Sequence, residues 1–401
     1  MSFKNDFPIL SHEIRGNPIT YLDSAASTQK PRSVIDAVSN FYETSYENVH
    51  RGMNSLSISA TDQFERAREN VRKFINAKNT NEVIFSHGAT DSINIIANAL
   101  MNKFQDGGEI LVTELEHHSN FLPWMRICNL SNLELKIVPI NDNGIVDEQQ
   151  IIDSCNQSTK VLAITHMTNT TGQILDISKI KKNIPNSILI SLDGCQSIAH
   201  CNIDVQSLDC DFYSFSSHKL YGPSGVGVMY GKEDLLNEIN PLTLGGGMIN
   251  QVNTNDFSYA MLPNKFEAGT PPIEAVVGFS AAIDYLNSIN LNDIFQEEKN
   301  LRQALIDNLK DIPSIEIYGS DSKINASSIV SFNVVDKNYN DIATFLDQYG
   351  IMIRGGHHCC QPFMKKLNIP GSCRVSFGVY NDMHDIEIFI DSLKKTIKLL
   401  Q

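Results

Sequence analysis

The sequence predicts an α/β fold in which a mostly parallel sheet is covered by helices on both faces. From about residue 17 to residue 230, short apolar runs typical of strands alternate with segments whose apolar residues recur at helical spacing. This alternation is typical of repeated strand-helix-strand units. Polar motifs follow directly after several of the runs, and such sheets bind ligands beyond the carboxyl ends of their strands. We therefore expect a binding site at one edge of the sheet.

Eight apolar runs are predicted to be strands in this first part of the chain. They span 19–23, 82–86, 109–113, 133–139, 160–166, 187–193, 209–216 and 225–230. Helical patterns lie between them. The pattern at 61–77 is an example, because Phe64, Ala67 and Val71 recur on one face.

The remainder of the chain predicts loops and then a second, smaller α+β domain. Residues 231–270 are rich in glycine, asparagine and proline and are expected to form loops, and an apolar helix at 274–290 then bridges to the small domain. For the small domain we expect helices at 293–311 and 340–349, strands at 315–318, 328–334, 351–354 and 373–378, and a last helix capped by Asn381.

We divide the chain into three parts on this basis. Residues 1–16 are expected to pack on the small domain, residues 17–270 to form the large domain, and residues 271–401 to form the bridging helix and the small domain. A chain of 401 residues is long enough for two domains with a large core.

Composition excludes several classes of protein. The net charge is −14 and basic residues form no block, which argues against a nucleic-acid partner. No apolar run approaches a membrane span, and the first residues lack the apolar core of a signal peptide. The eight cysteines are scattered and form no Cys-x-x-Cys pair, which favours free thiols in a reducing compartment. We expect a cytoplasmic protein.

The stretch from Asp211 to Gly227 contains Lys219, a candidate for a reactive amine. An apolar run delivers Lys219 to a strand end, and the glycines beyond it let the backbone approach a ligand closely. An amine shielded from water there favours the neutral, nucleophilic form that Schiff-base chemistry needs. Ser216 and His218 add hydrogen-bonding groups suited to a phosphate. Taken alone, this window is explained equally well by a lysine that opens a solvated turn.

Asp193 strengthens the case for a cofactor. It ends the run 187–193, and one strand-crossover-strand unit fills the distance along the chain to Lys219. Both residues are therefore expected at the carboxyl ends of neighbouring strands. Pyridoxal phosphate requires a carboxylate opposite its lysine, because the carboxylate keeps the pyridine nitrogen protonated. The alternative is an Asp that caps the next helix, and we favour the cofactor once Lys219 is considered as well.

Two more motifs follow predicted strands. Residues 88–92, which include Ala89 and Thr90, open a helix, and the free N–H groups of a helix start suit the phosphate of a cofactor. His117 follows the strand at 109–113, where an imidazole is suited to stack on an aromatic cofactor and to move protons near neutral pH. Each motif alone is also typical of an ordinary helix start.

The run His357-His358-Cys359-Cys360 predicts a reactive thiol rather than a metal site. Four consecutive ligands are poorly spaced for tetrahedral zinc, because neighbouring side chains diverge. Flanking glycines indicate a mobile loop, in which the two histidines and Arg354 would favour the thiolate. A cysteine that only fills apolar space is the alternative.

Arg374 lies within an otherwise apolar predicted strand. A buried guanidinium needs a partner, and either a substrate carboxylate or an internal salt bridge would serve. The sequence alone does not separate these two interpretations.

Taken together, the motifs resemble those of the class V, fold-type I pyridoxal-phosphate enzymes, and in particular the NifS-like, group II cysteine desulfurases of the SufS type. The resemblance runs from Tyr-Leu-Asp-Ser-Ala-Ala-Ser-Thr-Gln-Lys-Pro at 21–31 to Arg374 and beyond. It rests most on three motifs, Ser-x-His-Lys-Leu-Tyr-Gly-Pro-x-Gly-x-Gly at 216–227, Phe-Glu-Ala-Gly-Thr-Pro at 266–271 and Arg-x-Gly-His-His-Cys at 354–359. It implies a large domain built on a mostly parallel, seven-stranded type of sheet.

The resemblance also implies a role for each candidate residue. Lys219 would hold the cofactor covalently and then move the substrate Cα proton, while Asp193 would pair with the pyridine nitrogen and His117 would stack on the ring. Gln196 and Asn169 would contact the hydroxyl side of the ring. The phosphate would be held by Ala89, Thr90, Ser216 and His218. Arg374 would bind the substrate carboxylate, with Arg354 and Asn169 also at the substrate.

The implied reaction converts L-cysteine to L-alanine and leaves the sulfur on Cys359 as a persulfide, for transfer to an acceptor protein of iron-sulfur cluster assembly. Thr270 would come from the second subunit of a homodimer. We expect Cys360 to be inert, because a disulfide between adjacent cysteines is strained. The alternatives are a selenocysteine lyase, another class V enzyme such as an aminotransferase or a kynureninase-like hydrolase, and a scaffold without catalytic activity.

Overall fold

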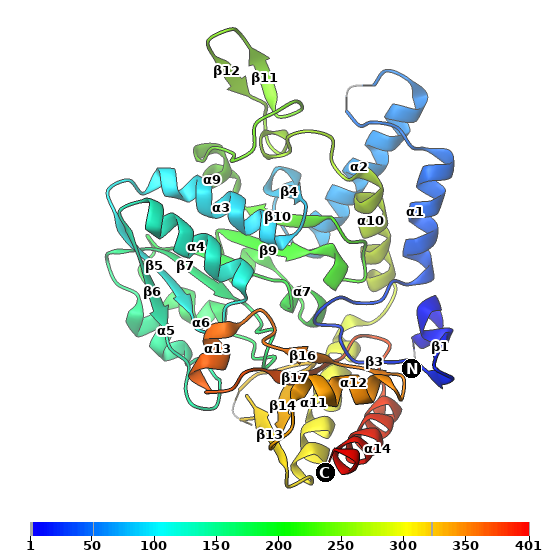
Figure 1. The fold of residues 1–401 in the computed structure, drawn as a ribbon. Coiled ribbons are helices and arrows are strands. Elements are labelled where there is room, and N and C mark those ends of the chain that lie inside the picture. Colours follow the sequence, from blue (N-terminus) through cyan, green and yellow to red (C-terminus); the bar gives the residue numbers. More distant parts are fainter. Residues whose placement is uncertain (1–2, 51, 322–323, 401) are drawn as a thin grey trace.

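The computed structural model describes residues 3–50, 52–321 and 324–400, and it contains two main sheets. A seven-stranded sheet forms the centre of the larger part, and a four-stranded sheet lies near the C-terminal end of the chain (Figure 1). In the part of the chain that the structure describes, no helix is both long and apolar enough to cross a membrane.

The seven-stranded sheet is mostly parallel, as predicted. Its strands lie in the order β4-β10-β9-β8-β7-β5-β6, and only β10 runs antiparallel to its neighbours. The strands are β4 (Val83–Ser86), β5 (Gly108–Thr113), β6 (Leu133–Val138), β7 (Thr159–Thr165), β8 (Leu189–Asp193), β9 (Phe212–Ser216) and β10 (Gly227–Gly231). Each overlaps a run predicted from the sequence.

Both faces of this sheet are buried, which explains why its strands read as continuous apolar runs. Successive side chains of a strand point to opposite faces, and Val83 and Phe85 accordingly join one apolar cluster while Ile84 joins another. The first face is covered by α2 (Ser55–Phe74) and α10 (Ile273–Asn287), and the second by α3 (Ala89–Lys103) and α4 (His118–Leu130). Figure 1 shows the two helix layers on either side of the sheet.

The four-stranded sheet is antiparallel and has its own apolar core. Its order is β13 (Ile315–Tyr318), β14 (Ile329–Val334), β17 (Ser372–Ser376) and β16 (Arg354–Gly356). Three helices contribute to the core, namely α11 (Leu291–Lys310), α12 (Tyr339–Asp347) and α14 (Met383–Leu399). Their buried faces carry the helical periodicity that predicted them.

Shorter elements connect and cover the sheets. The helices are α1 (Arg32–Thr44), α5 (Glu148–Ser154), α6 (Ile177–Lys182), α7 (Ser197–His200), α8 (Val205–Leu208), α9 (Glu233–Glu238) and α13 (Gln361–Lys366). The 3-10 turns are η1 (Lys4–Asp6), η2 (Pro8–Ser11), η3 (Thr80–Glu82), η4 (Ser217–Lys219) and η5 (Asn264–Phe266). The remaining strands are β1 (Glu13–Ile14), β2 (Asn17–Pro18), β3 (Thr20–Tyr21), β11 (Ile249–Val252), β12 (Phe257–Tyr259) and β15 (Ile351–Met352).

The predicted strand at 19–23 does not join the seven-stranded sheet. It is reduced to β3, which pairs in parallel with β15, and Leu22 joins the core of the four-stranded sheet. The predicted strand at 351–354 divides into β15 and the start of β16, which belong to different sheets. A periodicity analysis finds apolar runs but does not identify the strands with which they pair.

Other differences concern residues 231–290 and one helix cap. The expectation that 231–270 forms only loops is wrong, because it contains α9 and the hairpin of β11 and β12. The bridging helix α10 ends at Asn287 rather than 290. The last helix is capped by Asp382, whose side chain accepts from His384 and Asp385, and not by Asn381.

The N-terminal segment contacts the last helix. Residues 1–2 of the predicted segment 1–16 lie outside the described residues, but Lys4 forms an ion pair with the buried carboxylate of Asp385 in α14. Phe7 is buried and packs its ring against Tyr380 at a centroid distance of 4.9 Å. These contacts support the expected packing of this segment on the C-terminal part.

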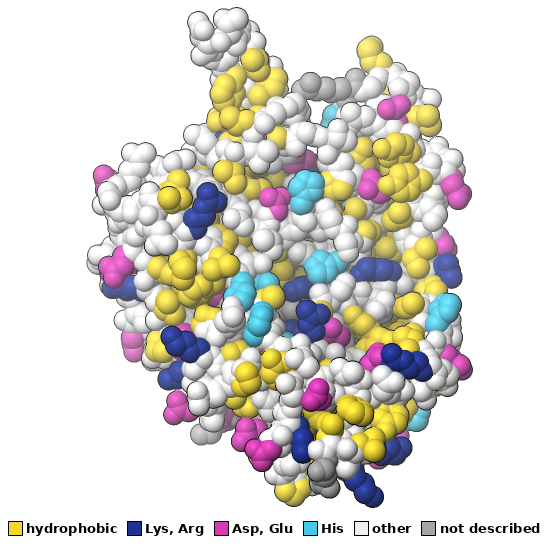
Figure 2. All heavy atoms as spheres, in the orientation of Figure 1, with side chains coloured by type: hydrophobic (Ala, Val, Ile, Leu, Met, Phe, Trp, Pro, Cys, Tyr) yellow, Lys and Arg dark blue, Asp and Glu magenta, His cyan; other side chains and the backbone are white. Residues whose placement is uncertain are grey.

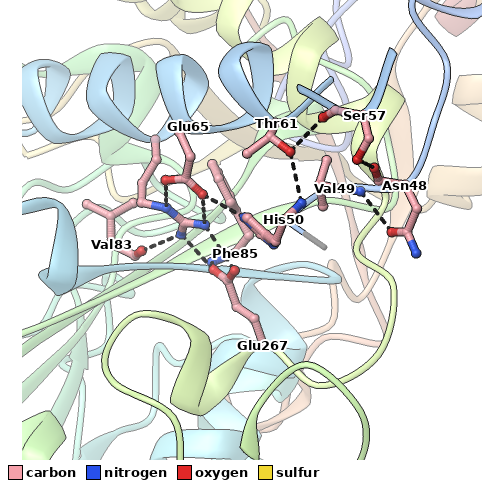
Figure 3. Close-up of polar contacts among 10 residues, drawn as sticks. Asn48, Val49, His50, Ser57, Thr61, Glu65, Val83, Phe85 and Glu267 are labelled. Atoms are coloured by element: carbon pink, nitrogen blue, oxygen red, sulfur yellow. Dashed lines mark hydrogen bonds and ion pairs between the residues drawn. The ribbon is translucent and has the colours of Figure 1, made fainter. Parts of the chain in front are cut away.

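A buried arginine ties α2 to the segment that precedes α10. The guanidinium of Arg68, which is fully buried, contacts Glu267 at 2.7 and 3.0 Å and Glu65 at 3.0 Å (Figure 3). It also donates to the carbonyl of Val83 at 2.8 Å, and Glu267 accepts from the N–H of Phe85 at 2.7 Å. Figure 3 shows the carboxylates of Glu65 and Glu267 facing each other within this network. The network joins α2, β4 and the 264–271 segment.

Removal of this cation should destabilise the fold strongly. In Arg68→Ala the carboxylate of Glu267 stays buried without its partner, and we expect the free energy of unfolding to fall by about 3–5 kcal/mol. Arg66→Ala is the matched control on the same helix, because Arg66 is exposed and pairs only at 3.8 Å with Asp284. Urea denaturation of both variants measures the difference, and equal losses would contradict the buried-charge account.

Candidate active site

A cleft of about 410 Å³ lies at the carboxyl ends of the parallel strands, between the seven-stranded sheet and the loop that follows β16. Pockets that bind small molecules typically have volumes of about 300–1,000 Å³. Of the residues predicted for the site, those that line the cleft are Ala89, Thr90, His117, Asn169, Asp193, Gln196, Ser216, His218, Lys219, Arg354, Cys359 and Arg374. The structure therefore brings together every predicted site residue except Thr270.

Asp193 and Lys219 come from neighbouring parallel strands. Asp193 is the last residue of β8, pairs in register with Ser214 of β9, and is buried. Its carboxylate accepts from the N–H of Cys195 at 2.9 Å. Lys219 lies in the 3-10 turn that begins where β9 ends, and it is half-buried. The amine and the carboxylate thus line one cleft, as the spacing of the two residues predicted.

The start of α3 forms the anion-binding end of the cleft. The N–H of Ala89 donates to the hydroxyl of Ser216 at 2.8 Å, and the hydroxyls of Thr90 and Ser119 lie 2.7 Å apart. Close packing here requires glycine, because a Cβ on Gly227 would lie 2.5 Å from the Cα of residue 88. N–H and hydroxyl donors at the first turn of a helix match the chemistry of a phosphate, so this donor set fits the phosphate of pyridoxal phosphate. Ser119 was not identified from the sequence.

His117 caps α4 and is uncharged at neutral pH. Its Nδ1 accepts from the N–H of Ser119 at 3.1 Å. Burial and the nearby ammonium of Lys219 lower the pKa of His117 to about 3. With Lys219 charged, the imidazole is neutral at neutral pH, and its part in proton transfer stays a prediction. A neutral ring remains suited to stacking.

The segment after β3 encloses the other side of Lys219. The carbonyl of His218 accepts from the N–H of Thr28 at 3.0 Å and from the ammonium of Lys30 at 3.1 Å, and the side chain of Gln196 donates to Ala25 at 2.9 Å. Burial, then the charges of Lys219 and Lys30, lower the pKa of His218 to about 4. Burial also lowers the pKa of Lys30 to about 8. His218 is therefore a neutral donor or acceptor.

The loop that carries Cys359 is held by hydrogen bonds from the larger part of the molecule. The N–H of His118, the first residue of α4, donates to the carbonyl of Cys359 at 2.7 Å, and the side chain of Asn169 donates to the carbonyl of His358 at 2.7 Å. His358 and Cys359 have φ values of 52° and 53°, in the left-handed region that L-residues seldom adopt. The N–H of Cys359 donates to Nδ1 of His357 at 3.1 Å. These contacts fix the backbone on both sides of the thiol.

The neighbours of Cys359 differ from the sequence-based expectation in one respect. His358 is buried, its Nε2 lies 2.9 Å from the hydroxyl of Ser372, and burial holds its pKa well below the usual value. It therefore carries no charge at neutral pH and does not favour the thiolate of Cys359. Cys360 is fully buried, and burial raises its pKa. That burial agrees with the expectation that Cys360 is inert.

Arg374 forms the internal salt bridge, which is one of the two interpretations that the sequence leaves open. Its guanidinium is buried, pairs with Asp23 at 3.1 Å and donates to the carbonyl of Asn169 at 3.0 Å. Its Nε is buried and has no hydrogen-bond partner among the described residues. The internal salt bridge is therefore present, and Arg374 also lines the cleft. Arg354 is exposed and lies 3.9 Å from the other oxygen of Asp23.

Thr270 lies outside this cleft. It is exposed and lines a separate cavity of about 680 Å³, together with His50 and residues of the 246–250 segment. Within one chain it is therefore not part of the cleft that contains Lys219. This location is compatible with a contribution to the site of another subunit.

Comparisons with known proteins cover almost the full chain. The family model for aminotransferase class-V matches residues 20–389. A cysteine desulfurase from Serratia proteamaculans (strain 568) is 41% identical over 400 residues, which cover 99% of this chain and 98% of the relative. The solved structure of the cysteine desulfurase CsdA (S-sulfonic acid) from Escherichia coli has a TM-score of 0.91 at 33% identity and covers 99% of this chain and 98% of its own. The apo structure of a cysteine desulfurase from Thermococcus onnurineus NA1 has a TM-score of 0.93 at 34% identity. The match covers 98% of this chain and 97% of that one.

A buried carboxyl next to His117 predicts that the stability of the fold depends on pH. Glu116 is fully buried, and burial raises its pKa to about 8, although Asn120 and Thr113 donate to it. In the unfolded chain this carboxyl titrates near ~4.3, so between that pH and about 8 the folded state binds the extra proton. Stability therefore falls as the pH rises through this window.

The variant Glu116→Gln removes the carboxyl that takes up this proton. We expect its unfolding free energy to fall less steeply than that of the unmodified chain between pH 5 and pH 8, by at most about 1.4 kcal/mol per pH unit. Urea denaturation at several pH values measures both slopes. Parallel pH profiles would show that Glu116 is ionised in the folded chain.

Proposed function

The chain belongs to the class-V aminotransferase family and is a cysteine desulfurase that uses pyridoxal phosphate, and on this premise we propose that the cleft around Lys219 and Cys359 is its active site. The observation that carries the proposal is the content of this one cleft. It holds an amine, a buried carboxylate, a helix start with hydroxyl donors, a guanidinium and a thiol. These are the groups that the desulfurase reaction needs.

The residues around Lys219 are suited to bind the cofactor. Lys219 would attach its aldehyde carbon, and Asp193 would pair with its ring nitrogen. His117 would stack on the ring, and Gln196 and Asn169 would contact its hydroxyl side. The phosphate would be held by Ala89, Thr90, Ser216 and His218. When bound, pyridoxal phosphate accepts the electrons that remain at the substrate Cα after a proton has been removed.

Two arginines and Lys219 would bind the substrate, L-cysteine, and move its Cα proton. Arg374 would bind the carboxylate, while its pair with Asp23 keeps the guanidinium in place. Arg354 and Asn169 would lie beside the same end of the substrate. The freed amine of Lys219 would take the proton from Cα and return one to the product carbon. These contacts would orient the substrate with its sulfur towards the Cys359 loop.

Cys359 would accept the sulfur. Its thiolate attacks the sulfur of the substrate, so that an S–S bond forms as the C–S bond breaks, and the electron pair of the broken bond stays with the substrate carbon. That carbon gains a proton, and alanine leaves. Cys359 then carries a persulfide. No external oxidant is needed, because the substrate carbon is reduced as the sulfur is oxidised.

The larger setting of the reaction is also a proposal. The free cysteines support a reducing compartment, the cytoplasm, and the NifS-like motifs support sulfur supply to an acceptor protein of iron-sulfur cluster assembly. The exposed position of Thr270 supports a homodimer with shared sites. We keep the division into residues 1–16, 17–270 and 271–401, with β3 tying the start of the large domain to β15.

Mass spectrometry after incubation with L-cysteine tests the role of Cys359. We expect one extra sulfur on the peptide that contains Cys359, retained in Cys360→Ser and lost in Cys359→Ser. Cys360 is the internal control, because it is the neighbouring residue but is buried. Persulfide on Cys360 in the Cys359→Ser variant, with normal alanine production, would contradict the assignment.

Complementation between two inactive variants tests the shared site. Lys219→Ala and Thr270→Ala homodimers should each have little activity. After subunit exchange, half of the dimers contain both kinds of chain, and each of these has one intact site if Thr270 acts across the interface. Activity should therefore recover to about a quarter of the unmodified level, as expected for a two-fold symmetric interface. No recovery after verified exchange would place Thr270 in the site of its own chain.

A further inference from the structure

The turn at residues 168–173 follows β7 and carries Asn169, which lines the active-site cleft. The cleft lies where the larger part of the molecule meets the C-terminal part, and Figure 2 shows histidine and basic side chains gathered near the middle of this face. The side chain of Asn169 donates to the carbonyl of His358 at 2.7 Å. The position of the turn therefore affects both the cleft and the Cys359 loop.

Four successive carbonyls of this turn accept hydrogen bonds from the C-terminal part. The carbonyls of residues 169, 170, 171 and 172 accept, in this order, from the guanidinium of Arg374 at 3.0 Å, the hydroxyl of Ser331 at 2.6 Å, the guanidinium of Arg302 at 3.3 Å and the N–H of Ser327 at 3.1 Å. The approach is close, because a Cβ on Gly172 would lie 2.3 Å from the carbonyl oxygen of Ser327. The turn is thus held by the other part of the molecule.

Hydrogen bonds within the turn make it one unit. The hydroxyl of Thr168 accepts from the N–H of Gln173 at 3.0 Å and lies 2.8 Å from the hydroxyl of Thr171. The N–H of Gly172 donates to the carbonyl of Thr168 at 3.2 Å. These residues are buried, so a broken bond would leave its groups without water as a replacement partner. A displacement of Thr171 would therefore also move Asn169.

Arg302 of α11 is a buried cation whose hydrogen bonds all go to carbonyls. Besides the carbonyl of Thr171, it donates to those of Ile329 at 3.1 Å and Gly319 at 3.0 Å, and none of the described residues forms an ion pair with it. Burial lowers its pKa to about 10, so it is charged at neutral pH. A buried charge costs stability, and an apolar side chain of similar volume is often at least as stable. The carbonyls that it binds, including one in the 168–173 turn, explain why a cation lies here.

We propose that Arg302 is a positioning residue for the desulfurase reaction, because it holds the 168–173 turn where Asn169 contacts both the substrate end of the cleft and the Cys359 loop. This inference rests on the proposed function, which places Asn169 at the substrate. Arg302 is not among the residues that line the cleft, so it acts only through the turn. Ser331, which holds the adjacent carbonyl, offers a second and independent way to loosen the same turn.

Steady-state alanine production by the full-length holoenzyme tests this role. In Arg302→Met an apolar side chain replaces the cation, and in Ser331→Ala only a hydroxyl is lost. Both variants should raise the KM for L-cysteine by roughly threefold to tenfold, as expected for the loss of one buried hydrogen bond, with a smaller change in kcat. Arg302→Lys keeps a cationic donor and should recover part of the loss.

Leu309→Ala is the matched control on the same helix. Leu309 is fully buried in the core of the four-stranded sheet, further along α11. Its truncation should lower the free energy of unfolding, as the loss of any structural side chain would, and leave the KM unchanged. An unchanged KM in both Arg302→Met and Ser331→Ala, or an equal rise in Leu309→Ala, would overturn the proposal.

Hydrogen–deuterium exchange follows the turn itself, without substrate or turnover. In Arg302→Met the amides of residues 168–173 and 357–360 should exchange at least about threefold faster than in the unmodified holoenzyme, whereas Leu309→Ala should not single out these segments. Unchanged exchange in both segments of Arg302→Met would contradict the proposal.

The variant Asn169→Ala separates this inference from the proposed function. If Asn169→Ala raises the KM but Arg302→Met and Ser331→Ala do not, the site assignment stands and the role of Arg302 is wrong. If Asn169→Ala leaves the KM unchanged, the proposed role of Asn169 fails, and this inference fails with it. A raised KM in all three variants, with the faster exchange, is the result that we expect.

Discussion

The parallel pairing of β8 with β9 is the constraint on which the site depends. Because both strands run in the same direction, Asp193 and the turn that holds Lys219 leave the sheet at the same edge. The start of α3 reaches this edge because β4 is also parallel to β9, with β10 antiparallel between them. The carboxylate, the amine and the anion site are thereby held by backbone hydrogen bonds rather than by loop conformation, which gives a bound cofactor a rigid frame.

The thiol side of the cleft is built differently. Cys359 lies on a loop with two successive residues in the left-handed region, a conformation that costs about 1–3 kcal/mol per residue. Hydrogen bonds from His118 and Asn169, both in the larger part of the molecule, offset this cost. The hydrogen bond from Arg374 to the carbonyl of Asn169 crosses the same boundary. The position of Cys359 relative to Lys219 therefore depends on contacts between the two parts of the molecule, whereas the position of Asp193 does not.

Much of this arrangement was predictable from the sequence, and the failures have physical causes. The strands of the large sheet were found because both of their faces are buried, which produces apolar runs such as Val83–Ser86. The β11–β12 hairpin was missed because its residues are mostly exposed and carry no alternating pattern. Strand β3 was recognised but assigned to the wrong sheet, since pairing with β15 is a long-range property. The neutrality of His117 and His358 was also missed, because it follows from burial that only the folded chain reveals.

The central claim is that Lys219, opposite Asp193, is the lysine that carries the cofactor. Borohydride reduction of the holoenzyme, followed by peptide mass spectrometry, tests it directly, because reduction fixes pyridoxal phosphate permanently to the lysine that holds it. The most informative competitor is Lys30, which lies beside His218 and has a pKa lowered to about 8 by burial, as a nucleophilic amine would. Our account predicts the reduced cofactor on the peptide that contains Lys219, whereas its presence on Lys30, with Lys219 unmodified, would contradict the account.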